Sequence, residues 1–410
     1  MVYVRRDVEN ELEKWIDDKE IMLLRGPRQS GKTTLLLRLK EMLDARGVGD
    51  ERIRYVSFED DSERLKFEAD CKEFVSLHLT AEKTYFLFDE VQYVRDIGKK
   101  LKLLFDSFPQ AKFVATGSSS FDLTNAGSFL VGRAVFIDVF PFNFGEFLRA
   151  KDAALERKYS EVRFSWDRFG LPEKTVYLAD LNRLLHEYLT YGSYPRVVLE
   201  PDFGKKRELL KNLFTAYVEK DVVVLYGNKY RDGAVKLLKS LAGMLGSTVN
   251  FETLAQSSGL KYNDVRKLLP LLQDSFVVRV VRPFHRSLAS ELRKNPKVFF
   301  FDAGLRNHLL ERFDNISFDG LYENFVCNSL AQEGAVKYWR TTAKTEVDFV
   351  LERAGGLVPV EVKTAAKVTR ALASFASEYG VKYAVLANLD VLEKRELPGC
   401  TVLLLPFAYF

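Results

Sequence analysis

The chain has 410 residues, of which 47% are hydrophobic and 13% aromatic, which is enough to build two to four separate cores. Lys and Arg total 61 against 57 Asp and Glu, a formal charge of +4, which excludes a chain that is basic throughout, so any nucleic-acid surface must be local. Three widely spaced cysteines exclude a disulfide framework, and the absence of a signal peptide and of any apolar run of ~18 residues predicts a cytoplasmic protein with no membrane partner.

After a predicted helix at residues 7–17, residues 26–33 read G-x-x-x-x-G-K-T. An apolar run at 21–24 precedes this motif and a helical segment at 34–40 follows it, the order typical of the phosphate-binding loop of nucleotide hydrolases. Two glycines permit the tight turn, Lys32 is expected to reach the β- and γ-phosphates of ATP, and the Thr33 hydroxyl is expected to join the Mg²⁺ shell. The predicted nucleotide-binding residues are Gly26, Pro27, Arg28, Gln29, Ser30, Gly31, Lys32, Thr33 and Thr34.

Four further apolar runs, at residues 54–58, 84–88, 112–116 and 135–139, alternate with helical segments and predict a parallel sheet covered on both faces. The run at 84–88 ends in Asp89-Glu90, where Asp89 would hold Mg²⁺ and Glu90 would orient the attacking water. A small polar residue after the run at 112–116 would lie between the γ-phosphate and that water, and Ser118 is the first candidate, Thr116 the second. Arg133 would stabilise transition-state charge in its own chain or in a neighbouring one, the alternative being a surface ion pair.

These motifs, together with Pro141-Phe142-Asn143-Phe144-Gly145-Glu146-Phe147, resemble those of a known group. The chain is similar, over nearly its whole length, to archaeal and bacterial AAA-superfamily ATPases that carry a long C-terminal domain of unknown function. The resemblance implies an AAA-type P-loop ATPase core at residues 1–150. The resemblance indicates the domain architecture of the chain more clearly than its biological role.

Residues 151–235 are helical and charged, and predict a helical lid over the nucleotide. Residues 236–312 predict a winged helix, with helices at 235–245, 250–257 and 261–273, a turn at Gly259 and a strand at 276–283. Asp302 is expected to cap the helix that follows it. DNA is the expected partner of this domain, the alternative being protein contacts or domain packing. Its predicted DNA-binding residues are Lys261, Arg266 and Lys267 for phosphates, and Tyr262 and Asn263 for base edges.

Residues 313–410 contain a second constellation of charged residues. Asp348 lies in an apolar strand, and twelve residues later the next strand carries Glu361 and Lys363, on one face because the strand period is two. Asp348 and Glu361 would bind Mg²⁺, Lys363 would position a water, and Glu323 could add an acid. This pattern resembles the D…E-x-K signature of the restriction-endonuclease-like fold. Charged residues on an exposed strand, or a nuclease scaffold that only holds DNA, are the alternatives.

The combined prediction is a multidomain α/β protein: an AAA-type parallel sheet, a helical lid, a winged helix and a C-terminal endonuclease-like domain. Its predicted function is Mg²⁺-dependent ATP hydrolysis coupled to action on DNA, with metal-dependent nuclease activity in the last domain. The alternative is an ATP-dependent switch that binds a protein partner through an inert C-terminal domain. Arg133 alone hints at a homo-oligomer.

Overall fold

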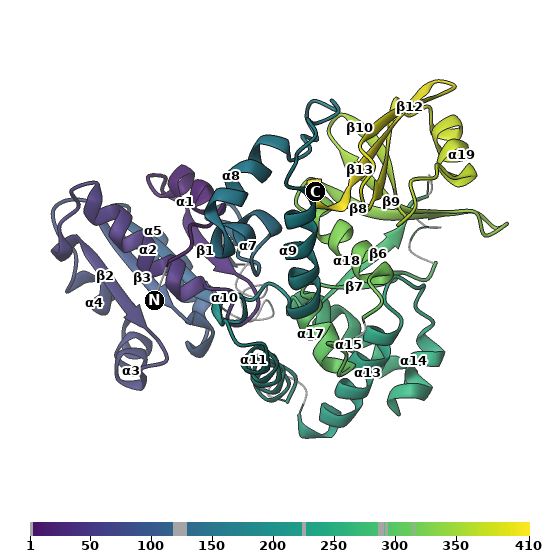
Figure 1. The fold of residues 1–410 in the computed structure, drawn as a ribbon. Coiled ribbons are helices and arrows are strands. Elements are labelled where there is room, and N and C mark those ends of the chain that lie inside the picture. The colour runs from purple at the N-terminus through teal and green to yellow at the C-terminus, as the bar shows by residue number, and fades with distance from the viewer. Residues whose placement is uncertain (1–2, 118–128, 224–226, 286–290, 292–293, 315) are drawn as a thin grey trace. The chain divides into compact units, whose positions relative to one another are not determined.

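The computed structural model describes residues 3–117, 129–223, 227–285, 291, 294–314 and 316–410 (Figure 1). The chain divides into two compact units. The first comprises the residues up to Pro141 together with Asp274–Phe276, and the second comprises Phe142–Gln273 and Val277–Phe410. Each unit is described below by itself.

The first unit is built on a five-stranded parallel sheet with the order β2-β3-β4-β1-β5. Its strands are β1 (Ile21–Arg25), β2 (Ile53–Ser57), β3 (Thr84–Asp89), β4 (Ala111–Gly117) and β5 (Ala134–Asp138). Each coincides within a few residues with an apolar run of the sequence, which confirms the predicted parallel sheet. Because all strands are parallel, their carboxyl ends meet at one edge.

Helices cover both faces of this sheet, since its strands are apolar on both sides. Met22 and Leu24 pack into one core with α1 (Glu9–Trp15) and α2 (Lys32–Ala45), whereas Ile21 and Leu23 point to the other core. That second core is covered by α3 (Asp61–Ala69), α4 (Cys71–Ser76) and α5 (Ile97–Ser107).

The second unit begins with helices α7 (Phe144–Lys151), α8 (Ala153–Val162), α9 (Leu178–Tyr191), α10 (Pro195–Leu199) and α11 (Phe203–Tyr217), followed by a π-helix at Val218–Val223. Asn143 and Glu146 form a capping box at the start of α7, in which each side chain accepts from the other residue's backbone N–H. Three more helices follow: α13 (Arg231–Gly243), α14 (Phe251–Ser258) and α15 (Tyr262–Asp274). Asn250 caps α14, and Gly259 ends it in the left-handed region, as the sequence predicted.

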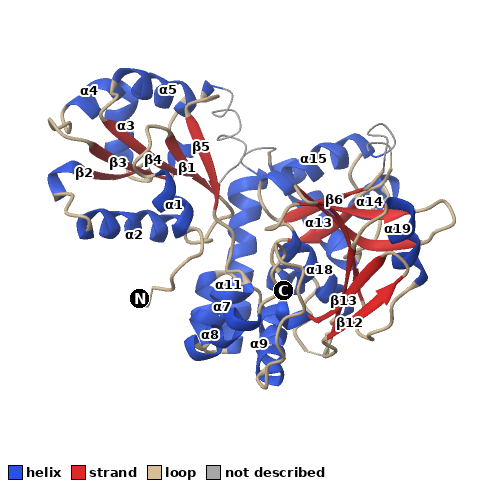
Figure 2. Ribbon diagram, turned by 90° about the horizontal axis from the view of Figure 1, so that it is seen from above, coloured by secondary structure: helices blue, strands red, loops and turns tan. Residues whose placement is uncertain are grey.

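An eight-stranded mixed sheet completes the second unit, in the order β12-β13-β11-β10-β9-β8-β6-β7. Figure 2 draws the strands in red. Its strands are β6 (Val278–Pro283), β7 (Lys297–Phe300), β8 (Ala335–Arg340), β9 (Glu346–Arg353), β10 (Gly356–Val362), β11 (Tyr383–Asn388), β12 (Glu393–Leu397) and β13 (Cys400–Pro406). The helices α17 (Ala303–Leu309), α18 (Asp319–Leu330) and α19 (Arg370–Tyr379) accompany them. β6 pairs with β7 on one side and with β8 on the other, so one sheet runs across the predicted domain boundary after residue 312.

Two smaller expectations are met in this fold. Asp302 caps α17 by accepting from the Leu305 N–H at 2.7 Å, and it also accepts from the N–H and the hydroxyl of Ser193. All three cysteines are free and buried, as expected of small hydrophobic residues. Within the described ranges, no helix is both long and apolar enough to cross a membrane.

Candidate nucleotide site and a second acidic site

The P-loop leaves the carboxyl end of β1 and ends where α2 begins at Lys32. Gly31 adopts the left-handed region with φ +97°, which favours glycine. Gly26 is constrained by space instead, because a Cβ there would lie 2.1 Å from the carbonyl oxygen of Val139. Both predicted glycines therefore have a steric reason for their identity.

Ser30, near the end of this loop, and Lys32, the first residue of α2, are buried. Lys32 Nζ donates to the carbonyl oxygens of Gly26 at 2.9 Å and Pro27 at 2.7 Å. Ser30 Oγ is buried and, within the described part of the chain, has no hydrogen-bond partner. A buried ammonium, an unsatisfied hydroxyl and the N-terminus of α2 suit the phosphates of a nucleotide, so the residues fit bound ATP.

Arg6 also supports the loop, and the sequence analysis missed it. Arg6 is buried, and its guanidinium donates to the Ser30 carbonyl at 3.0 Å and to the Phe140 carbonyl at 2.7 Å. No local motif marks this arginine, because its partners lie 24 and 134 positions away.

Asp89 and Glu90 lie at the carboxyl end of β3, on the same sheet edge as the P-loop. Asp89 is only 3% exposed, and both its oxygens are held: Thr116 donates to Oδ1, and Tyr55 donates to Oδ2 at 3.1 Å. Burial, together with the charge of Asp89, raises the pKa of Tyr55, so this hydroxyl stays a donor. A buried carboxylate at this edge suits Mg²⁺, whose preferred ligands are oxygens.

Glu90 adopts the left-handed region with φ +56°, which is rare for a residue other than glycine. Its N–H donates to Thr116 Oγ1 at 3.0 Å, and the Gln92 amide donates to its carboxylate. Strained backbone of this kind concentrates at functional sites.

Two polar residues after the middle of β4 were candidates for the position between the γ-phosphate and the attacking water. Ser118 lies outside the described residues. Thr116, the second candidate, is fully buried and bridges Asp89 and Glu90.

Arg133 is not near the P-loop of its own chain. It precedes β5, and its carbonyl accepts from the Ile21 N–H at the start of β1, so it lies at the opposite sheet edge, roughly 16 Å of strand away. There Arg133 forms an ion pair with Asp106 at 2.9 Å, which was the alternative interpretation of this residue. This position corrects the intramolecular role, and a role in a neighbouring chain stays a prediction.

The second constellation does assemble in the structure. Asp348 on β9 and Glu361 on β10 lie one residue beyond the paired Phe349 and Val360, so they face each other across an antiparallel ladder. Asp348 accepts from the Val362 N–H at 2.9 Å and from Lys363 Nζ at 3.1 Å. Glu361 is 2% exposed and accepts from the Thr369 hydroxyl through Oε1, whereas Oε2, among the residues described, has no hydrogen-bond partner.

Burial raises the pKa of Glu361 to about 7, with the Asp348 charge acting in the same direction. The pKa of Glu323 on α18 is likewise raised to about 7, by burial and then by Asp348. Burial alone would lower the pKa of Lys363, but Asp348, with Glu361 and Glu323, outweighs it and raises the pKa. The three carboxylates and the lysine therefore share one electrostatic site.

The donor set at this site suits a divalent cation, since a buried carboxylate oxygen with no donor is costly unless a cation approaches it. Over the described residues, no group of three or more His, Cys, Asp and Glu side chains is close enough to hold a metal ion. Asp348 and Glu361 would therefore supply a two-carboxylate site, with Lys363 beside it.

Four of the predicted DNA-binding residues lie on α15, and Lys261 directly precedes this helix. Lys261, Tyr262, Asn263, Arg266 and Lys267 are all exposed, while Val265, Leu268 and Leu272 of the same helix are buried. Arg266 lies over the Tyr262 ring, 5.8 Å from its centroid. The helix thus presents a basic and aromatic face.

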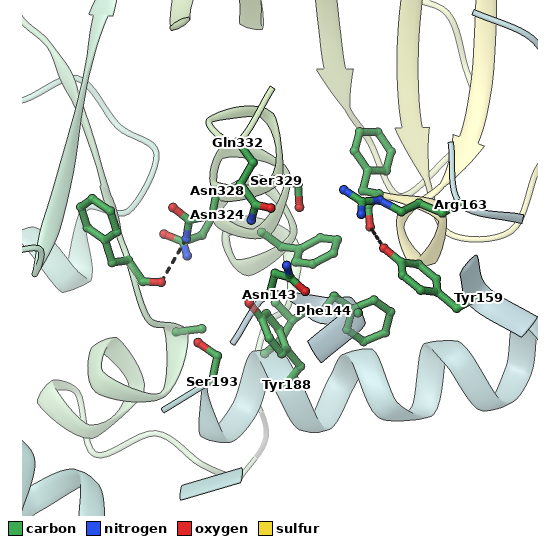
Figure 3. A pocket seen from close by; sticks show the side chains of 16 residues that line it. Asn143, Phe144, Tyr159, Arg163, Tyr188, Ser193, Asn324, Asn328, Ser329 and Gln332 are labelled. Atoms are coloured by element: carbon green, nitrogen blue, oxygen red, sulfur yellow. Dashed lines mark hydrogen bonds between the residues drawn. The ribbon is translucent and has the colours of Figure 1, made fainter. Parts of the chain in front are cut away.

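A cavity of about 30 Å³ lies between α7, α9 and α18, lined by polar side chains such as Asn143, Ser193, Asn328 and Gln332 (Figure 3). This volume holds about two water molecules. The cavity is too small for a nucleotide and contains none of the predicted site residues.

Comparison with known proteins agrees with the geometry of the first unit. Residues 18–148 match the family model described as AAA domain. This segment is therefore similar to an AAA domain, and it is called the AAA domain below. Residues 182–315 and 318–406 match two models described as domains of unknown function (DUF8612 and DUF4143). The AAA domain thus contains the whole P-loop and the Asp89-Glu90 pair.

Similar chains occur in bacteria and archaea. An uncharacterized protein of Haemophilus influenzae is 28% identical over 86% of each chain. One from Methanocaldococcus jannaschii is 27% identical over 78% of this chain and 70% of its own. Among solved structures, the Walker-type ATPase of Pyrococcus abyssi is 19% identical, covering 75% of this chain and 96% of its own, with a TM-score of 0.48.

Proposed function

We propose that the AAA domain binds ATP with Mg²⁺ and hydrolyses it. The observation that carries this proposal is the presence, on one edge of one parallel sheet, of a P-loop and a held Asp89-Glu90 pair. Mg²⁺, when bound, neutralises charge on the transferred phosphoryl group.

Different residues of the domain would bind the phosphates, hold the metal and activate the attacking water. Backbone N–H groups of the P-loop and Lys32 bind the phosphates, as the left-handed Gly31 and the buried Lys32 support. Thr33 and Asp89 would hold the metal. Glu90 accepts a proton from the attacking water and orients it, which requires the fixed position that its N–H bond to Thr116 provides.

Steady-state ATPase assays with two variants test this function. Glu90→Gln is expected to bind ATP normally and to lower kcat by at least ~100-fold. Lys32→Ala is expected to lose tight ATP binding. The exposed Glu13→Gln of the same unit serves as the control. Normal ATP binding by Lys32→Ala would refute the proposal.

The same proposal assigns DNA as the partner of the second unit. Residues 151–235 would form the helical lid, and residues 236–312 the winged helix, because three helices precede an antiparallel β6–β7 pair. The exposed Arg266 and Lys267 of α15, together with Lys261 just before the helix, would contact phosphates. Tyr262 and Asn263 would contact base edges.

A second candidate function is metal-dependent cleavage of DNA by residues 313–410. The observation that favours it is Glu361 Oε2, which lacks a hydrogen-bond partner within the described ranges, facing Asp348 and Lys363. Asp348 and Glu361 would bind Mg²⁺, and Lys363 would position the attacking water. The alternative is an ATP-dependent switch that binds a protein partner, with an inert C-terminal domain.

Cleavage assays on single-stranded, duplex and branched DNA, with Mg²⁺ or Mn²⁺ and with or without ATP, separate these readings. Lys363→Ala is expected to abolish cleavage, whereas the exposed Lys367→Ala leaves it intact. Loss of cleavage in Lys32→Ala as well would mean that ATP gates the nuclease. No cleavage of any substrate would favour the switch.

A further inference from the structure

Asp89 is held by residues from both neighbouring strands of the AAA domain. We propose that the Tyr55 hydroxyl is a positioning group for Asp89, which fixes the orientation in which this carboxylate receives Mg²⁺. The inference rests on the proposed ATPase function. Tyr55 belongs to none of the sequence motifs of the nucleotide site.

The register of β2 and β3 brings Tyr55 to this position. Ser57 is paired with Asp89, and Tyr55, two residues earlier, is paired with Leu87. Side chains two residues apart share one face of a strand, so the Tyr55 ring lies on the face covered by α2, against the core that includes Leu87. From there the long side chain brings its hydroxyl to Oδ2 of Asp89 at 3.1 Å.

The second oxygen of Asp89 is held from the other side. Thr116 on β4 donates to Oδ1, so the central strand β3 presents a carboxylate fixed by its two neighbours, β2 and β4. A carboxylate oxygen accepts more than one hydrogen bond, so each still has capacity for a metal-bound water. Two donors from opposite sides leave the carboxylate plane little freedom to rotate.

This arrangement also connects the metal position to the water position. Thr116 Oγ1 accepts from the Glu90 N–H at 3.0 Å while it donates to Asp89. A shift of Asp89 would therefore disturb Glu90 through Thr116. Loss of the Tyr55 hydroxyl should affect metal-dependent steps and spare the P-loop contacts with the phosphates.

The test is Tyr55→Phe, which removes the hydroxyl and keeps the ring. The primary readout is the Mg²⁺ concentration that half-saturates the Mg²⁺-dependent binding of a fluorescent ATP analogue, which does not require hydrolysis. We expect this midpoint to rise ~10–100-fold, the usual effect of losing a group that orients a metal ligand. Binding of the analogue in EDTA should stay within about twofold of wild type. Mn²⁺, which binds such sites more tightly, should restore much of the loss.

The control is Tyr85→Phe, since Tyr85 is a buried tyrosine at the other end of β3. Thr116→Val, which removes the donor to the other oxygen, should raise the same midpoint. If Tyr55→Phe fails to fold, Tyr55→Met, which also removes the hydroxyl and keeps an apolar side chain, provides the second test of Tyr55. An unchanged Mg²⁺ midpoint in folded Tyr55→Phe overturns the inference. Absence of ATP hydrolysis by the wild type would refute the proposed function instead, and the binding readout would still decide the role of Tyr55.

Discussion

Buried carboxylates of this protein differ in how their two oxygens are satisfied. Asp89 accepts a hydrogen bond at each oxygen, from Thr116 and Tyr55. Glu361 accepts one at Oε1 from Thr369, while Oε2 has no partner in the described part of the structure. Such an oxygen loses its hydration without replacement, so the charged form of Glu361 is disfavoured.

Glu361→Gln is therefore expected to change the pH dependence of stability. The pKa of Glu361 is raised from 4.5 to about 7 in the folded state by burial, so the folded protein binds more protons than the unfolded chain between these values. Wild-type stability should fall as pH rises through this window, while glutamine does not titrate. Relative to wild type, the free energy of unfolding of the variant should increase by up to about 3 kcal/mol between pH 4.5 and 7.5. Above this range the difference should stay constant.

Urea unfolding in EDTA at half-unit pH steps measures this difference. The exposed Glu378→Gln is the control and should follow the wild-type profile. Parallel stability curves for Glu361→Gln and wild type would mean that Glu361 is not destabilised by its surroundings.

At the scale of elements, the connection between α9 and α10 depends on one glycine. Gly192 has φ +80° and ψ −164°, a region that is almost exclusively glycine, and a Cβ there would lie 2.3 Å from the Asp302 carboxylate. Gly192→Ala should lower the free energy of unfolding by about 2–4 kcal/mol, because backbone strain and the clash add. Gly170→Ala, where a Cβ would meet open space, should stay within about 0.5 kcal/mol.

Chemical denaturation of both glycine variants provides the comparison. A Gly192→Ala protein as stable as Gly170→Ala would show that this connection adjusts without cost and that the Asp302 contacts can move.

Helix α15 carries the prediction on DNA. Arg266→Ala/Lys267→Ala should weaken duplex binding at every sequence and reduce the salt slope of log K by about 2, if each side chain contacts one phosphate. Arg157→Ala/Lys158→Ala on α8 removes the same charge from another exposed helix face and should leave the slope unchanged. Fluorescence anisotropy between 50 and 200 mM salt measures both. An equal loss of DNA affinity in the two double variants would indicate an effect of net charge. No loss of DNA affinity in either would favour contacts between α15 and protein.

At the scale of the whole molecule, local patterns predicted elements better than their assembly. The five strands of the AAA domain were predictable because each is a short apolar run that ends in polar or glycine residues. The hairpin that brings Asp348 to Glu361 was predictable for the same reason, since two adjacent strands and a Gly355-Gly356 turn define its register.

Contacts between distant segments were not predictable. The pairing of β6 with β8, the Tyr55–Asp89 bond and the Arg6–Ser30 bond join residues that no local period relates. Arg133 illustrates the same limit. It directly precedes β5, so its distance from the P-loop depends on the direction and register in which β5 pairs with β1. Side-chain types and spacing indicate chemistry, whereas sheet order decides which groups meet.

The division into two units gives the last prediction. All described P-loop residues, Asp89, Glu90 and Tyr55 belong to the first unit, and Asp348 and Glu361 belong to the second. A ligand that binds only the folded form of one unit stabilises that unit by mass action, by about 2.7 kcal/mol at a hundred times its Kd. Scanning calorimetry should therefore resolve two transitions, and a non-hydrolysable ATP analogue with Mg²⁺ should raise one of them by roughly 5–10 °C.

Lys32→Ala should show both transitions and no shift, which separates nucleotide binding from a general effect of the analogue. Lys363→Ala should shift as wild type does, because its site lies in the other unit. If both transitions instead rise together in wild type, the units unfold as one cooperative structure. Nucleotide binding would then stabilise the second unit as well, and this linkage would give the AAA domain a direct energetic route to the Asp348–Glu361 site.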